Sequence, residues 1–567
     1  MLHDRRAFLG YFTSIGLGST LLPGVLWGRV AAGEEITPET IAAAEEIAGV
    51  QFTPDERQQM VKGLERQEQQ IDALHKITIP NSVAPAIKFD PLLPGETVDT
   101  KRLPLVRSAP AIPARVPPDD ELAFLPVTEL SELVRRRKVT STQLTQLYLS
   151  RLKKYDPLLH FVITLTEDRA LRQAAERDAE LKRGKYRGPL HGIPWGGKDL
   201  LAVKGYPTTW GAAPYKDQVI DTDATVVRRL DDAGAVLVAK LTLGALAQGD
   251  VWFGGTTRNP WKPDQGSSGS SAGPASATAA GCVGFSVGSE TLGSISSPST
   301  RCGDTGLRPT FGFVPRTGAM ALSWSMDKLG PICRGVEDCA LVMHAIYGPD
   351  GEDLTVHDAA FNWNAHADPR KLRVGYFKAQ FDSDDKRYAV NKPFDQATLD
   401  TLRKIGFDLK PVEMPDEPYG ALTLVLDAEA AAAFDELTRT GRDKEMTAQG
   451  DSDWPNVFRR SRFIPAVDYV NANRARVFAM QAWRDLFKGV DVIVTPTFSG
   501  QLTATNLTGQ PAVIVPNGFR ETDGTPVSIT FLADLYQDAK ALSVARAYQQ
   551  ATDFHTKHPT LVVGAAQ

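Results

Sequence analysis

The spacing of apolar residues predicts alternating helices and strands from about residue 119 onward. Leu144, Leu147, Tyr148 and Leu152 fall on one face of a helix that begins near Ser141. Further helices are expected at 127–137, at 168–183 and from about 223. Short apolar runs predict strands at 161–165, 234–240, 371–376 and 491–495. Strands that alternate with helices favour an α/β layer architecture.

The residues before 119 have a different pattern. Thr37-Pro38 and Thr53-Pro54 are each followed by acidic residues, which is typical of helix starts, so residues 34 to about 78 are expected to be helical. Prolines then recur from Pro80 to Pro118. Because proline lacks a backbone donor and fixes φ, this stretch should be an extended strap around the main domain, or else a flexible linker. The predicted division is therefore an extension at 33–118 and a main domain at 119–567, with a mostly helical insertion at about 420–485 near the pocket mouth.

The first 32 residues predict export. Arg5-Arg6 precedes an uncharged stretch at 10–28, and small residues follow at 30–32. This arrangement resembles a twin-arginine signal peptide, although Asp4 stands where Ser or Thr is usual. We expect residues 1–32 to be that signal and the protein to be periplasmic or secreted. The 19 uncharged residues are also just enough to span a bilayer, so an uncleaved signal would anchor the protein to the membrane.

Composition narrows the classes of partner. The 567 residues carry a formal net charge of -5 without a basic stripe, which disfavours nucleic acid and fits a small-molecule substrate. The four cysteines form no CxxC pair and have no histidine at ligand spacing, so a metal site is not expected and they should be small buried hydrophobes. The oligomeric state is left open between a monomer and a homodimer.

A stretch rich in glycine and serine, at 266–276, differs from a flexible linker. A small and apolar segment at 277–288 follows it at once, and Gly293-Ser294 then forms a second turn. Two serine-bearing turns separated by one buried helix or strand indicate a pair of cooperating hydroxyls, and the backbone N–H groups of such a turn can form an oxyanion hole. Composition alone leaves four serines open as the partner in the first turn: Ser267, Ser268, Ser270 and Ser271.

A serine nucleophile requires a base. Histidine is the usual one, and His191 is the histidine nearest a glycine-rich turn. Lys198 ends the same run in an apolar setting, where burial would lower its pKa enough for it to act as a base. A surface lysine or a structural ion pair is the commoner role for such a residue, so the residues alone leave the base open.

Three ordered blocks carry a resemblance to the amidase signature family. They are a His-Gly-Ile-Pro block that ends at Lys198, a Gly-Ser-Ser block at 269–271 and a Gly-Ser-Ile block at 293–295. Flanking segments also match at 259–261, 306–312 and 506–512, and the resemblance covers about residues 120–555. The family's interval of 24 residues between its two serines selects Ser270 and Ser294.

The resemblance implies a mixed central β-sheet flanked by helices, an α/β/α sandwich. It implies that neutral Lys198 accepts a proton from Ser270, which takes the proton of the nucleophile Ser294. Backbone N–H groups of Thr291, Leu292, Gly293 and Ser294 would hold the oxyanion. The peptide bond between Gly269 and Ser270 would be cis. No cofactor or metal is implied.

Three positions depart from the family pattern: Glu290 stands for Asp, Leu292 for Gly and Ser296 for Arg. Because Leu292 keeps its N–H, we expect it to change substrate preference more than catalysis. We also expect Glu290 to form hydrogen bonds around the oxyanion turn, His191 to be structural, and the loop Asn506–Pro511 to lie near the active centre.

The sequence therefore predicts an exported amidase that hydrolyses a carboxamide C–N bond of a small molecule through an acyl-enzyme at Ser294. One alternative is the A-type subunit of an aminoacyl-tRNA amidotransferase, against which the export signal and the long extension argue. An ester or carbamate hydrolase would use the same acyl-enzyme chemistry. A non-catalytic binding protein is disfavoured because all three catalytic positions are filled.

Overall fold

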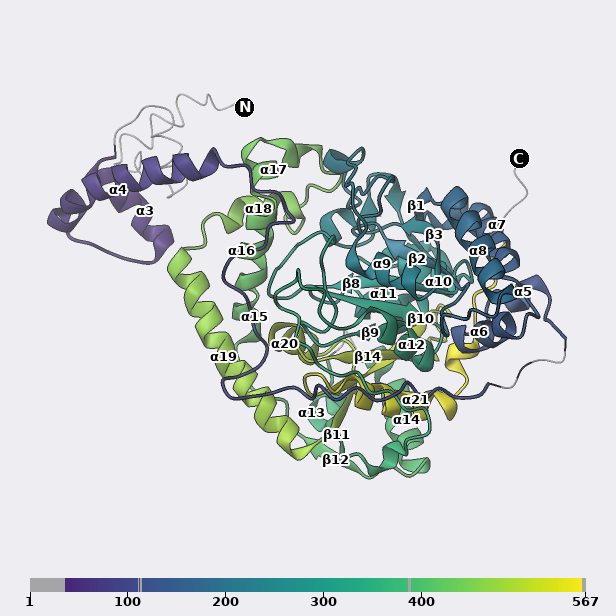
Figure 1. Cartoon of the computed structure of the whole chain (residues 1–567). Coiled ribbons are helices and arrows are strands. Elements are labelled where there is room, and N and C mark those ends of the chain that lie inside the picture. The colour runs from purple at the N-terminus through teal and green to yellow at the C-terminus, as the bar shows by residue number, and fades with distance from the viewer. Residues whose placement is uncertain (1–35, 111, 113–114, 386–388, 563–567) are drawn as a thin grey trace.

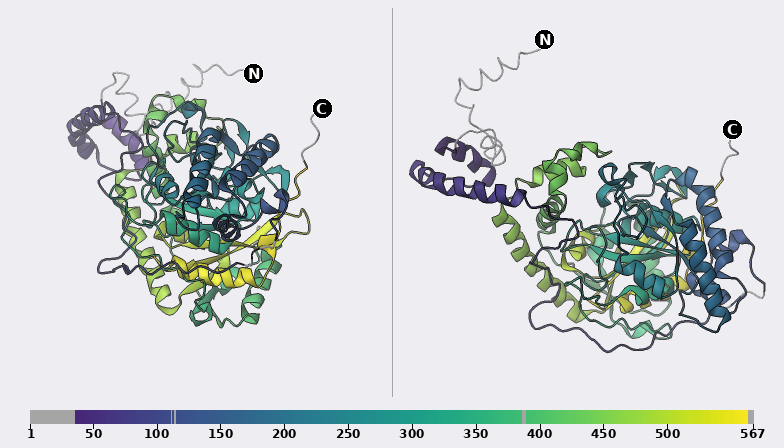
Figure 2. Two further views of the ribbon diagram at one scale, coloured as in Figure 1. Left: turned by 45° about the vertical axis from the view of Figure 1, so that its right-hand side comes forward. Right: turned by 45° about the horizontal axis from the view of Figure 1, so that its top comes forward.

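The computed structural model describes residues 36–110, 112, 115–385 and 389–562. The signal peptide predicted at 1–32 lies outside these residues. A large α/β body carries most of the chain, and a pair of helices near the N-terminus projects from it (Figures 1 and 2). Within the described part of the chain, no helix is both long enough and apolar enough to cross a membrane.

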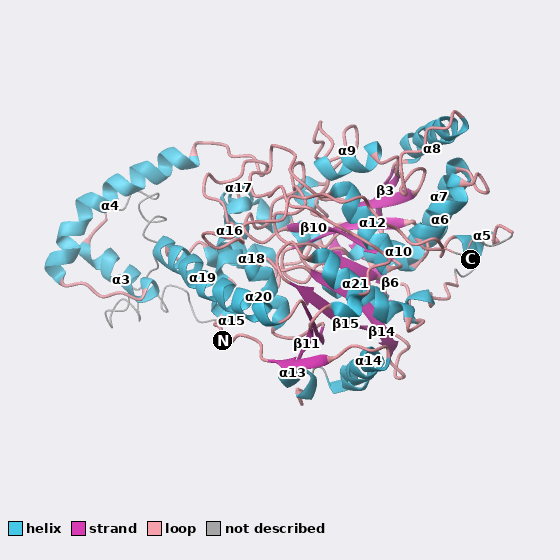
Figure 3. Cartoon of the chain, turned by 60° about the horizontal axis from the view of Figure 1, so that its bottom comes forward, coloured by secondary structure: helices cyan, strands magenta, loops and turns pink. Residues whose placement is uncertain are grey.

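One mixed sheet of eleven strands forms the centre of the body, with helices packed around it (Figure 3). Its strands, in spatial order, are β1 (Val162–Leu165), β3 (Val236–Leu241), β2 (Pro194–Lys198), β8 (Phe285–Glu290), β10 (Lys328–Cys333), β9 (Thr305–Arg308), β14 (Ala512–Phe519), β15 (Pro526–Ala533), β13 (Val492–Pro496), β11 (Val374–Phe377) and β12 (Leu409–Val412). Strand β2 runs parallel to both β3 and β8, and β11 runs parallel to β12 and β13. The other neighbours are antiparallel. The predicted mixed α/β fold is confirmed.

The body contains the helices predicted at 127–137, from about 141, at 168–183 and from about 223, together with others that were not predicted. They include α6 (Val127–Arg135), α7 (Ser141–Leu159), α8 (Glu167–Lys182), α9 (Thr225–Asp232), α10 (Ala272–Ala279), α11 (Ser296–Cys302), α12 (Val336–Ile346), α14 (Lys392–Lys404), α20 (Gln501–Thr508) and α21 (Asp538–Gln550). The cap of α7 is Thr140, one residue before the predicted Ser141. Its hydroxyl accepts from the N–H of Gln143, whose side chain accepts from the N–H of Thr140. Ser141 and Thr142 instead donate their backbone N–H groups to Asp178.

The N-terminal extension contains the two predicted helices, α3 (Pro38–Ala48) and α4 (Pro54–His75), each with a capping box. The described residues of the following proline-rich segment form no helix and lie against the body (Figure 1). Asn81 donates to the carbonyls of Ala321 and Ala433, and Glu96 pairs with Arg484 at 2.6 Å. The strap is therefore confirmed over the flexible linker, whereas the division into domains stays a prediction.

A group of helices at 419–489 lies along one side of the body (Figure 1). It comprises α15 (Tyr419–Leu422), α16 (Leu424–Ala433), α17 (Asp435–Arg439), α18 (Trp454–Ser461) and α19 (Ala466–Gly489). Helices therefore make up much of 420–485, whereas the insertion near the pocket mouth stays a prediction. The four cysteines are buried and form no disulfide, as expected for small hydrophobes.

Candidate active site

Two neighbouring parallel strands bring the predicted catalytic residues together. Lys198 is the last residue of β2, and β8 ends at Glu290, just before the turn that holds Ser294. Gly197 lies opposite Val287 in this pair, so Lys198 and the end of β8 reach the same edge of the sheet. The first serine turn precedes α10, and the N–H of Ser271 donates to the carbonyl of Ser294 at 3.1 Å, which ties the two turns together.

Lys198 is fully buried among hydroxyl groups. Its Nζ lies 2.7 Å from Oγ of Ser270, 2.8 Å from Oγ of Ser289 and 3.2 Å from Oγ of Ser271. Burial lowers the pKa of Lys198 well below its ordinary value, and the more distant Asp327 and Glu290 oppose this shift only in part. The structure therefore gives Lys198 the environment of a neutral amine that can accept a proton.

The contacts of the first turn distinguish its serines. Oγ of Ser271 donates to the carbonyl of Ser289 at 3.0 Å and accepts from the N–H of Ser289 at 3.1 Å, so it is held by β8. A Cβ at Gly288 would lie 2.6 Å from that oxygen, so only glycine permits this approach. Ser268 instead pairs with Ser297 at 2.7 Å. The Ser267 hydroxyl is buried without a partner among the described residues. Ser270 is the hydroxyl closest to Lys198, as the resemblance implied.

The backbone of this turn contradicts one prediction. No cis peptide occurs in the described part of the chain, so the prediction of a cis bond between Gly269 and Ser270 is wrong. The turn is built instead from two consecutive residues with positive φ, Ser268 at 65° and Gly269 at 56°. A Cβ at Gly269 would lie 2.4 Å from Cδ of Pro298, which accounts for glycine there.

The second turn holds the predicted nucleophile. Ser294 is half-buried, follows Gly293 with a φ of 91°, and forms no side-chain hydrogen bond to Ser270 or Lys198 among the described residues. Within the same described part, the N–H groups of Leu292, Gly293 and Ser294 find no protein acceptor. Unpaired N–H groups beside a serine are the arrangement that an oxyanion requires. The catalytic roles themselves stay a prediction.

The buried carboxylate of Glu290 forms hydrogen bonds with the residues that follow Ser294. Glu290 accepts from the N–H groups of Ile295 and Ser296 and from the Ser296 hydroxyl, at 2.9, 2.8 and 2.9 Å. It also pairs with Arg308 at 3.0 Å and accepts from Nδ2 of Asn506 at 2.8 Å. Burial alone would raise the pKa of Glu290, but Arg308 and the surrounding donors hold it at about 2. The expected role of Glu290 around the oxyanion turn is confirmed.

Other residues of the site were missed or misplaced by sequence reasoning. Asn506 does lie at the centre, but on helix α20 and not in a loop. The contributions of Ser289 and Arg308 were not predicted. Asp327 was also missed; it accepts from the hydroxyl of Thr291 at 2.6 Å. The only sequence signal for Arg308 was its place in the flanking segment 306–312.

The residue after the lysine forms a second buried network. Asp199 pairs with Lys240 at 2.6 Å, and both side chains are almost fully buried. Oδ2 of Asp199 accepts from the N–H and the hydroxyl of Thr209, at 2.8 and 2.6 Å. These contacts fix the backbone beside Lys198 and so help to orient the amine.

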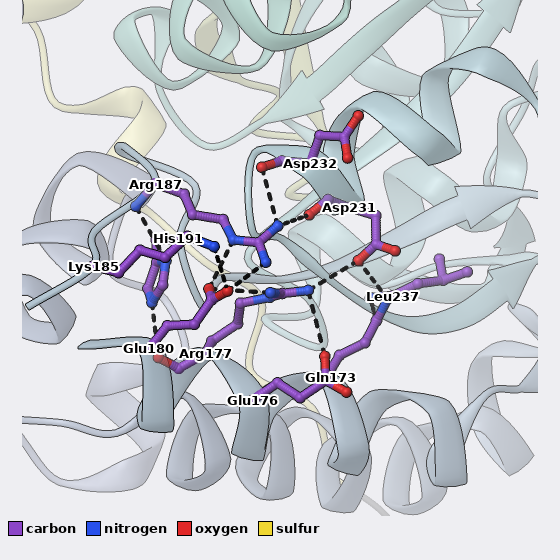
Figure 4. Close-up of polar contacts among 10 residues, drawn as sticks. All are labelled: Gln173, Glu176, Arg177, Glu180, Lys185, Arg187, His191, Asp231, Asp232 and Leu237. Carbon is purple, nitrogen blue, oxygen red and sulfur yellow. Dashed lines mark hydrogen bonds and ion pairs between the residues drawn. The ribbon is translucent and has the colours of Figure 1, made fainter. Parts of the chain in front are cut away.

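His191 lies in a different network, drawn in Figure 4. Its Nε2 is 2.9 Å from the carbonyl of Arg177, and its Nδ1 accepts from the N–H of Arg187 at 3.3 Å. Glu180 pairs with both arginines, at 3.1 and 2.6 Å. The ring therefore joins α8 to the segment before β2, as expected for a structural residue.

The comparisons with known proteins fit this geometry. A family model described as Amidase matches residues 143–504. The chain belongs to the amidase signature family. Peptide amidase from Stenotrophomonas maltophilia is a structural neighbour, with 30% identity and a TM-score of 0.66 over 75% of this chain and 96% of that one. The shared fold places the chain among amidase-family enzymes.

Curated relatives point to a more specific class. The glutamyl-tRNA(Gln) amidotransferase A subunit of Acinetobacter baumannii is 32% identical over 489 residues, which is 78% of this chain and 99% of the relative. The protein of the same name from Thermosynechococcus vestitus is 32% identical over 77% of this chain and 99% of the relative. This likeness overturns the expected carboxamide hydrolase and favours the alternative of an amidotransferase subunit. The expected export stays a prediction.

Proposed function

We propose that the chain is an A-type amidotransferase subunit, which detaches the nitrogen of a carboxamide donor for transfer to an acceptor held by a partner subunit. The observation that carries this proposal is the likeness to such subunits over nearly their whole length. The short contact between Lys198 and Ser270 supports the proton relay that this reaction would require.

The proton path starts at the nucleophile. As Ser294 attacks the donor carbonyl carbon, its proton passes to Ser270, and the proton of Ser270 passes to Nζ of Lys198. The carbonyl oxygen becomes an oxyanion that accepts hydrogen bonds from the free N–H groups of the 292–294 turn. Removal of one such donor typically costs about 3–4 kcal/mol of transition-state stabilisation.

Collapse of that intermediate breaks the C–N bond. The proton on Lys198 returns through Ser270 to the leaving nitrogen, which departs as ammonia and leaves the acyl group on Ser294. Water then attacks the acyl carbon with the same relay as base, and the donor is released as a carboxylic acid. A hydroxyl relay suits this cycle because neutral Lys198 is surrounded by hydroxyls and, among the described residues, hydrogen-bonds with no carboxylate.

An isotope experiment separates transfer from simple hydrolysis. The tagged full chain is purified from its native cells with any bound subunits and is supplied with glutamine labelled with nitrogen-15 in its amide. We expect the label to appear in an acceptor, and Ser294→Ala to abolish the transfer. A chain that purifies without partner subunits and releases all the label as free ammonium would contradict the proposal.

Export is a separate proposal that rests on residues 1–32. A fusion of residues 1–34 to a reporter that is active only after export tests it, with Arg5 and Arg6 replaced by lysine as the control. We expect the double replacement to retain the reporter inside the cell. A reporter retained with the unaltered segment as well would contradict export.

A further inference from the structure

A second polar hollow lies away from the catalytic serines. Its inner end is lined by Asp304 together with Cys302 and His555, and its outer part by Trp261 and Phe519. The two parts adjoin, because Trp261 and the segment 556–558 line both. Asp304 follows the last turn of α11, so it lies roughly 10 Å, the length of that helix, behind the Ser294 turn. We call this feature the Asp304 hollow.

The carboxyl group at its inner end lacks a partner. Asp304 is only 2% exposed, and its Oδ2 forms no hydrogen bond within the described part of the chain. Burial raises the pKa of Asp304 well above its ordinary value, and the charge of Arg334 opposes this shift only in part. The Nδ1 of His555 is buried without a partner in the same part of the chain. Asp304 and His555 both line the inner end, and each therefore has one buried polar atom without a hydrogen-bond partner among the described residues.

The cationic side chains near Asp304 form hydrogen bonds or ion pairs with other groups. Arg334 donates its guanidinium hydrogens to the hydroxyl of Tyr148 and to several backbone carbonyls. Lys557 pairs with Asp553 at 2.6 Å on the exposed side. Neither forms a hydrogen bond with Asp304, so its Oδ2 stays available as an acceptor, although the charge of Arg334 acts on the same carboxyl group.

The size of each part sets the shape of the ligand. The inner end has a volume of about 20 Å³, which is room for one group of the size of water. The outer part is wide open to solvent and presents the rings of Trp261 and Phe519, whose centroids are 4.7 Å apart. A small polar head and a larger flat apolar body fit these dimensions.

We propose that the Asp304 hollow binds a primary ammonium group attached to an aromatic or aliphatic body. The ammonium donates to Oδ2 of Asp304 and to Nδ1 of His555, and the body packs on Trp261 and Phe519. A quaternary ammonium is too large for the inner end, and a carboxylate would face Asp304. The proposal is independent of the amidotransferase reaction, since none of the catalytic residues lines the hollow.

Calorimetric titration of the full chain with phenethylammonium chloride tests the site. Binding at millimolar concentration is expected, and Asp304→Asn should weaken it about tenfold or more, because a hydrogen bond to a charged group is lost. The uncharged analogue 2-phenylethanol should bind about tenfold more weakly for the same reason. Asp264→Asn removes an exposed carboxyl group of β7 (Lys262–Gly266) and should leave binding unchanged.

A second variant is needed because misfolding of Asp304→Asn could also cause a loss of binding. Trp261→Leu removes one wall of the outer part and should weaken binding while Asp304 stays in place. The proposal is overturned if phenethylammonium does not bind to the wild type. It is equally overturned if Asp304→Asn binds within a factor of about two of the wild type, or if the alcohol binds as tightly as the ammonium.

Discussion

Replacement of Glu290 by glutamine tests whether this buried carboxylate holds the oxyanion turn. Its Oε2 accepts from two N–H groups and one hydroxyl of residues 295–296, and its Oε1 faces donors of Arg308 and Asn506. A glutamine NH₂ group in either position meets two or three donors and no acceptor. The Arg308 charge would also stay buried without a counterion. Loss of one partner from a buried pair costs about 3–5 kcal/mol, which is the expected drop in the free energy of unfolding.

Urea unfolding followed by tryptophan fluorescence measures this cost. Glu167→Gln is the matched control, because Glu167 pairs with Lys153 at 2.8 Å on the surface. An exposed pair of this kind contributes about 1 kcal/mol or less. In the amide-release assay, Glu290→Gln should lower kcat more than it raises KM, because the turn stabilises the transition state. A loss of stability no larger than that of the control would refute the reasoning.

The pH dependence of the same variant provides an independent check. The pKa of Glu290 is held at about 2, below the value of roughly 4.3 in an unfolded chain. A depressed carboxyl pKa stabilises the fold fully above the unfolded value and ceases to do so as the pH falls through the folded value. The difference in stability between the wild type and Glu290→Gln should therefore narrow between roughly pH 5 and pH 2. A difference that stays constant over this range would show that the carboxylate charge is not responsible.

Three further predictions concern the neighbouring residues. Lys198→Met should reduce kcat by about 10²–10⁴-fold, and a loss below tenfold would exclude Lys198 as the base. The wild-type rate should rise with pH through a midpoint below the ordinary pKa of lysine, because burial lowers the pKa of this amine. Asp199→Asn should cost about 3–5 kcal/mol in urea unfolding, because Lys240 loses its buried partner, and an unchanged midpoint would contradict this. Leu292→Gly should raise kcat/KM for bulky donors relative to small ones by about tenfold. Equal changes for both donors would show that Leu292 does not limit the pocket.

Local sequence patterns predicted the elements that depend on local physics. The threonine-proline starts of α3 and α4 and the apolar face of α7 were readable because capping and amphipathic periodicity act within a few residues. Strands β2, β9, β10, β12, β14 and β15 were not predicted, and β8 was left open between helix and strand. Apart from β12, these strands are buried along nearly their whole length. Their buried runs lack the alternation that marks a half-exposed strand, so periodicity does not separate them from other buried segments.

Local sequence patterns predicted the contacts of the active site even less well than they predicted the strands. The family interval selected Ser270, but the reason why Ser271 is excluded lies in Gly288, which lets β8 bind the Ser271 hydroxyl. That contact joins residues 18 positions apart. The partner of Glu290 on α20 is 216 positions away. Such contacts arise from the packing of distant elements, and no local pattern in the chain encodes them.

The departures at Glu290 and Ser296 are best understood as one structural unit. The family pattern places an aspartate and an arginine at these positions, whereas this chain has a longer acid and a serine. The serine does not neutralise the carboxylate; it donates a hydroxyl and an N–H to it, and the positive charge comes from Arg308 on β9. The extra methylene of glutamate lets the carboxylate reach both Arg308 and the start of α11. A single return to the family residue at either position would break this set of contacts, so Ser296→Arg alone should destabilise the turn by placing a second cation beside Arg308.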